Sequence, residues 1–79
     1  IGTLTIRVGL AEDVRTTAEN LIRANTTGLE LVSAGTAKQG TAMELTYRVR
    51  LRPTSSPTQL VTELNLVAGV DSVDLRRAD

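Results

Sequence analysis

The stretch from Glu44 to Pro53, ELTYRVRLRP, alternates strictly between apolar and polar side chains. A period of two residues is typical of a β-strand that buries one face, because successive side chains point to opposite sides of a sheet. The apolar side of this strand carries Leu45, Tyr47, Val49 and Leu51. The other side carries Glu44, Thr46, Arg48, Arg50 and Arg52. Such a strand suits a sheet that is covered on one face and open on the other.

The beginning of the chain predicts a strand followed by a helix. Residues 3–9 (TLTIRVG) alternate in the same way, with Leu4, Ile6 and Val8 on the apolar side. From Ala11 the spacing changes to that of an amphipathic helix, whose apolar stripe consists of Val14, Ala18, Leu21 and Ile22. The sequence NTTG at residues 25–28 is a signal for the end of this helix.

A second strand is expected over residues 29–35 (LELVSAG), but its inward face stays open. Either Leu29 and Leu31 or Val32 and Ala34 fit the buried side, and Gly35 permits a β-bulge. Residues 37–41 (AKQGT) then suit a hairpin turn that leads into the arginine-bearing strand.

The second half of the chain predicts another helix and a last strand. Ser56 can cap a helix, Pro57 fits its first position, and Gln59 completes a capping box. A helical stripe follows at Leu60, Val61, Leu64, Val67 and Ala68. Gly69 is expected to end this helix, and residues 72–77 (SVDLRR) then form a strand with Val73 and Leu75 inward.

The element order is therefore βαββαβ, which predicts an α+β, ferredoxin-like sandwich. Its four-stranded antiparallel sheet has the order 4-1-3-2, and both helices cover one face. The open face should then carry Arg7, Arg48, Arg50 and Arg76. We interpret them as a solvated face with cross-strand ion pairs or as a surface for a protein partner. Single-stranded RNA is disfavoured, because the sole aromatic side chain, Tyr47, points inward.

Composition narrows the chemistry further. The 79 residues predict a single domain over residues 1–79, with 9 basic and 9 acidic side chains and no net charge. That balance argues against nucleic acid as a partner. Without histidine or cysteine, disulfides, thiolate or imidazole metal sites and histidine-assisted catalysis are excluded. We therefore expect no catalytic residue, no metal and no cofactor.

One loop is a candidate ligand site. A glycine before a helix can hold an anion at the helix N-terminus, and Gly9 lies in such a loop, VGLAED. Glu12 and Asp13 already occupy that end of the helix, however, and would repel phosphate. A tight turn at Gly9 is the alternative interpretation. Gly9, Glu12 and Asp13 are the residues that we would assign to a small ligand.

The central strand, the capped helix and the sequence LNLVAGVDSVDLRR together resemble the end of ACT-like regulatory domains. In these domains the second helix runs into a G-V-x-x-V strand, matched here by Gly69, Val70 and Val73. The chain also resembles the cytosolic C-terminal domains of bacterial membrane proteins of the magnesium-transporter-C type and similar transporter-like proteins. It departs from the amino-acid-binding members, which have an Asp-x-x-Gly turn where this chain reads RVGLAED.

The resemblance implies a homodimer with a small ligand held between subunits near residues 9–13. It also implies a non-enzymatic regulatory or assembly domain of a transporter-like protein on the cytoplasmic side of the inner membrane. The chain begins with Ile1 rather than Met, so we expect it to be excised from a longer protein whose N-terminal region reaches the membrane. The alternative is a ligand-sensing domain of a soluble regulator or metabolic enzyme.

Overall fold

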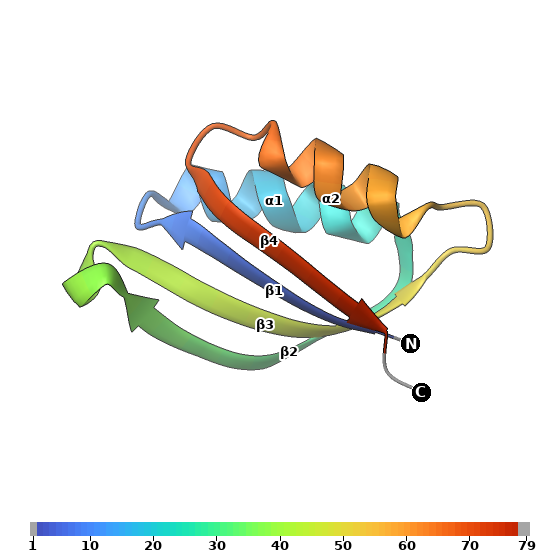
Figure 1. Ribbon diagram of the computed structural model, residues 1–79, viewed down its shortest axis with the longest axis horizontal. Helices are drawn as coiled ribbons and strands as arrows, with labels where there is room; N and C mark the ends of the chain where they lie inside the picture. Colours follow the sequence, from blue (N-terminus) through green and yellow to red (C-terminus); the bar gives the residue numbers. More distant parts are fainter. Residues whose placement is uncertain (1, 78–79) are drawn as a thin grey trace.

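The computed structural model describes residues 2–77, which form one antiparallel sheet with two helices on one of its faces (Figure 1). The elements are β1 (Gly2–Gly9), α1 (Glu12–Ala24), β2 (Thr26–Ala37), a short turn η1 (Lys38–Gly40), β3 (Ala42–Leu51), α2 (Pro57–Asn65) and β4 (Val70–Arg77). The strand order β2-β3-β1-β4 is the predicted order 4-1-3-2 read from the other edge. The predicted ferredoxin-like βαββαβ sandwich is thereby confirmed.

The core lies between the helices and the two central strands. It consists of Leu4, Ile6 and Val8 of β1, Leu45, Tyr47 and Val49 of β3, Ala18 and Ile22 of α1, and Leu60 and Leu64 of α2. Each is at most 1% exposed. Because burying one large aliphatic side chain contributes about 1.5–3 kcal/mol, this layer is the main source of stability. The alternation predicted for β1 and β3 accounts for six of these ten residues.

The outer strand β4 runs antiparallel to β1 along its full length. Gly2 is in register with Arg77, and Leu4 and Ile6 are in register with Leu75 and Val73. The first and last described residues therefore lie next to each other on neighbouring strands.

The predicted end of the second helix is wrong. α2 ends at Asn65 rather than just before Gly69, and the amides of Leu66 and Val67 close it by bonding to the carbonyls of Glu63 and Leu64. Gly69 lies in the following turn, where its φ of 94° favours glycine. Its carbonyl accepts a hydrogen bond of 2.9 Å from the amide of Gly9. This turn therefore holds the end of β1.

The open question about the inward face of β2 is answered by a bulge. Leu31 pairs with Tyr47 and Ser33 pairs with Thr46, so Val32 is the extra residue. The bulge thus lies at Val32 rather than at Gly35. It places Leu29, Leu31 and Ala34 on the helix side of the sheet, opposite Val49, Tyr47 and Leu45. Both predicted alternatives were partly right, because the bulge changes the phase of the alternation between them.

Replacement of Gly69 by alanine should destabilise the fold. A Cβ atom there would lie 2.7 Å from the Cγ2 atom of Val14, and the positive φ adds backbone strain. We expect Gly69→Ala to lower the free energy of unfolding by about 2 kcal/mol or more. Urea denaturation measures this, with Gly35→Ala as the control, because a Cβ at Gly35 meets nothing within 4 Å. Equal stability of the two variants would contradict the assignment.

Candidate functional site

The face opposite the helices carries polar side chains in rows that cross the sheet. Strand register defines the three rows as Glu30–Arg48–Thr3–Arg76, Ser33–Thr46–Thr5–Asp74 and Gly35–Glu44–Arg7–Ser72. No described side chain in these rows is aromatic. Bases of a nucleic acid would therefore find no stacking surface here.

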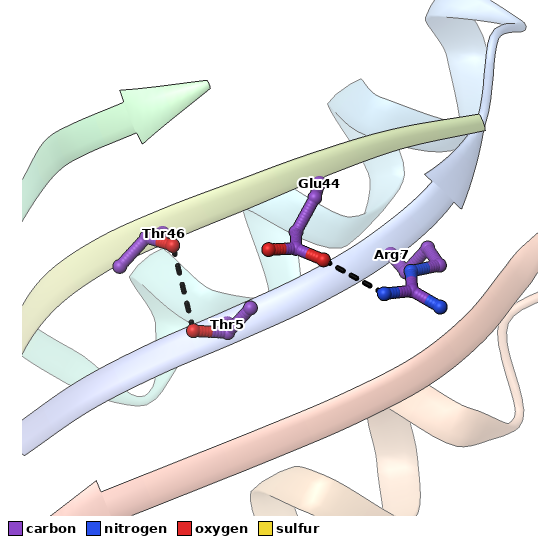
Figure 2. A network of polar contacts seen from close by, with 4 residues as sticks. All are labelled: Thr5, Arg7, Glu44 and Thr46. Atoms are coloured by element: carbon purple, nitrogen blue, oxygen red, sulfur yellow. Dashed lines mark hydrogen bonds and ion pairs between the residues drawn. The ribbon is translucent and has the colours of Figure 1, made fainter. Parts of the chain in front are cut away.

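A cross-strand ion pair joins the two central strands, β1 and β3, on this face. The Nη2 atom of Arg7 donates to the Oε2 atom of Glu44 over 2.8 Å, and both side chains are about two-fifths exposed (Figure 2). The hydroxyls of Thr5 and Thr46 meet at 3.4 Å in the next row. The Nε atom of Arg7 is buried without a partner. Glu44 is thus the group that fixes the Arg7 guanidinium.

The remaining predicted arginines also stand on this face, in looser surroundings. Arg76 donates along its own strand to Asp74 over 3.0 Å. Arg48 lies 3.7 Å from Glu30, and both side chains are about two-thirds exposed. Exposed pairs of this kind contribute about 1 kcal/mol or less. Arg50 has no ion pair among the described residues.

A shallow hollow lies beside Arg48 and Arg50. It measures about 240 Å³ and is lined by Gly28, Leu29, Glu30, Arg48, Val49 and Arg50. A second hollow of about 260 Å³ lies between α2 and β4, where Pro57, Thr58, Val61, Thr62 and Leu75 supply no charge. The first hollow could not be predicted from the sequence, because NTTG indicates a helix end, whereas Gly28 is a strand residue opposite Arg50.

The candidate ligand residues lie together at the start of α1. The amide of Gly9 is engaged by the carbonyl of Gly69, while Glu12 and Asp13 are exposed in the first turn of the helix. The Oδ1 atom of Asp13 accepts a hydrogen bond from the amide of Val14 over 3.0 Å. Neither hollow touches these three residues. The arrangement suits a cation better than an anion, because two carboxylates face solvent there.

A buried polar contact joins α1 to β3 and was not foreseen. The hydroxyl of Tyr47, a residue only 1% exposed, donates to the Oε2 atom of Glu19 over 2.8 Å. Arg15 lies 3.5 Å from the same carboxylate oxygen. Burial, together with the hydrogen bond and charge of Glu19, raises the pKa of Tyr47 to about 12. A buried tyrosine hydroxyl needs a partner, which was the available sequence signal.

Two other kinds of feature are absent from residues 2–77. No group of three acidic side chains gathers closely enough there to hold a metal ion. Neither helix in this part of the chain has the length and apolar content needed to cross a lipid bilayer.

Comparison with known proteins identifies the fold as ACT-like. No protein-family model matches the chain, and no curated protein matches it. Among solved structures, the ACT domain from GTP pyrophosphokinase of Chlorobium tepidum is similar, with a TM-score of 0.65, 14% identity and 94% of each chain covered. The C-terminal domain of the MgtC protein from Mycobacterium tuberculosis has a TM-score of 0.62 and 18% identity over 99% of this chain and 92% of that one. The predicted likeness to both kinds of domain is confirmed at the level of the fold.

The tyrosine contact predicts a distinctive alkaline titration. Tyr47 is the only tyrosine, so tyrosinate absorbance reports its ionisation directly. We expect a midpoint near pH 12 in the folded chain and near 10 in urea. The pKa of Tyr47 is higher in the folded chain than in the unfolded chain. The protonated hydroxyl of Tyr47 therefore makes its full contribution to stability below pH 10. This contribution is lost as the pH rises toward 12, and the difference between the folded pKa of about 12 and the ordinary value of 10.0 corresponds to roughly 3 kcal/mol.

Glu19→Gln is the matched variant for this titration, since glutamine keeps a hydrogen-bond acceptor but removes the negative charge. It should lower the midpoint of the folded chain. A native midpoint near 10, or one that does not move in Glu19→Gln, would contradict the role of this contact.

Proposed function

We propose that this chain is a non-enzymatic regulatory or assembly domain of a transporter-like membrane protein, on the cytoplasmic side of the inner membrane. Its mechanism is self-association along β2. The likeness of its fold to the C-terminal domain of MgtC supports its place in a transporter-like membrane protein. The observation that carries the mechanism is the exposed apolar surface of β2, at Leu31 and Val32.

Strand β2 is an edge of the sheet, and its residues 30–36 are all exposed. Leu31 is 44% exposed, although it stands directly opposite Tyr47, which is 1% exposed. Val32, at the bulge, is 53% exposed. In Figure 1, β2 forms the lower edge of the sheet, with both helices toward the opposite side of the view. A second copy of the chain could cover this apolar surface.

The backbone of β2 also suits pairing. Residues 26–37 contain no proline and no lysine, the residues that commonly protect edge strands. Bulges at Thr27 and Val32 interrupt the strand, so a partner strand would pair along residues 28–31 or 33–37. Contact between the same strand of two copies gives a two-fold symmetric dimer. This is the homodimer that the resemblance implied.

A small ligand between subunits remains part of the proposal. The residues that we assign to it are Gly9, Glu12 and Asp13. Because the two carboxylates are exposed and the Gly9 amide is already bonded, a ligand with an amino or other cationic group would fit best. Catalysis is not proposed, since the chain has no histidine or cysteine to serve as base or nucleophile.

A ligand-sensing domain of a soluble regulator or metabolic enzyme is the second candidate. The likeness to the ACT domain from GTP pyrophosphokinase favours it. Sequence upstream of this segment in its parent gene separates the two candidates. Apolar stretches of about 20 residues would indicate membrane helices, whereas a polar or catalytic domain would indicate a soluble parent.

Light scattering over a concentration series tests the mechanism. We expect the mass of a dimer for the wild-type chain. Val32→Lys should weaken association at least about tenfold, because a charge on an edge strand opposes pairing. Leu66→Lys is the matched control, since Leu66 is 80% exposed but lies at the end of α2 rather than on β2.

Circular dichroism should show that both variants keep the wild-type fold. A wild-type chain that stays monomeric at millimolar concentration would refute self-association of this segment. Equal loss of dimer in the two variants would refute β2 as its location.

A further inference from the structure

The hollow beside Arg48 and Arg50 results from a missing side chain on the open face. In the register of β2 and β3, Gly28 stands opposite Arg50 and Glu30 stands opposite Arg48. The two arginines are two residues apart on one strand face, which separates their Cβ atoms by about 7 Å. The hollow is therefore lined by Gly28, which has no side chain, and by both of these arginines.

Neither packing nor backbone geometry requires glycine at position 28. A Cβ atom there would meet only the Cβ atom of Arg50, at an ordinary 3.8 Å, and the φ of Gly28 is not in the left-handed region. Glycine within a strand is destabilising, and it often marks a place where a ligand approaches the backbone closely. The space at Gly28 is thus available to a ligand.

The charges around the hollow are incompletely neutralised. Arg50 has no acidic partner among residues 2–77, and Arg48 meets Glu30 only at 3.7 Å, with both side chains about two-thirds exposed. Two positive groups and one negative group line the hollow, which leaves a net charge of one. The Glu30 carboxylate occupies the place that an external anion would take beside Arg48.

We propose that this hollow binds the oxyanion of a small ligand, a carboxylate or a phosphate group, between Arg48 and Arg50. Guanidinium groups present forked N–H donors that match both oxyanions. Glu30 acts as an internal competitor, and its weak exposed pair with Arg48 is readily displaced. The hollow is formed within one chain, so this inference does not depend on self-association or on the site near Gly9.

Titration of the isotope-labelled 79-residue chain, followed by amide NMR shifts, tests this inference. Inorganic phosphate and acetate are the two probes, each at constant ionic strength. We expect saturable shifts at residues 28–30 and 48–50, with a Kd of about 1–10 mM for at least one probe. Saturation by phosphate alone indicates a phosphate-bearing ligand, and saturation by acetate alone indicates a carboxylate.

Four variants distinguish specific binding of an anion in the hollow from nonspecific attraction of anions to exposed arginines. Arg50→Gln should weaken binding at least about tenfold, and Glu30→Gln should strengthen it about threefold by removing the competitor. Gly28→Thr should fill the hollow and abolish binding while the fold persists. Gly35→Thr is its matched control, because it adds the same side chain to the same face of β2 at a distance and should leave binding unchanged.

Two results would overturn the inference. One is the absence of saturable shifts at these residues with both probes up to about 50 mM. The other is binding that survives in Gly28→Thr as well as in Gly35→Thr, which would show that anions bind exposed arginines without using the hollow. Neither result bears on the light-scattering mass, so the proposed self-association is judged separately.

Discussion

The structure depends on burying one face of the β1–β3 pair beneath two helices. On that face β1 and β3 each contribute three buried side chains, which are Leu4, Ile6 and Val8 and Leu45, Tyr47 and Val49. Helices α1 and α2 each contribute two fully buried side chains. Both helices lie on this face, so the opposite face is open to solvent and polar. The edge strand β2 keeps exposed apolar side chains at Leu31 and Val32 that this layer does not cover.

Features with a strict period could be predicted from the sequence. Alternation in β1 and β3 predicted the inward residues and placed Arg7, Arg48 and Arg50 on the open face, and the pattern of the last strand placed Arg76 there. The capping box before α2 was equally local, and Ser56 accepts from the amide of Gln59 as expected. These features depend on residues close together in the chain, where spacing alone determines which side chains share a face.

Features that depend on register could not be predicted. The bulge at Val32 lets β2 pair with β3 on both sides of that residue, and no local sequence signal marks its position. The ion-pair partners of the arginines could not be predicted either, because a register shift of one residue would give each arginine different neighbours. Predicting the hollow at Gly28 would require the strand register that places this glycine opposite Arg50. A buried Tyr47 hydroxyl indicates that some polar partner is needed, but the sequence does not indicate Glu19, which lies 28 positions away in the chain.

The register of Gly2 with Arg77 has a mechanical consequence for any longer chain that contains this segment. β1 and β4 are antiparallel neighbours whose outer ends emerge side by side. Tension applied through both ends would load the hydrogen bonds between these strands one after another, as in a zipper, instead of sharing the force among them. Such a domain resists pulling weakly compared with one whose end strands are loaded in shear. Segments that flank this domain can therefore set its orientation, but a sustained pull through both of them would separate β1 from β4.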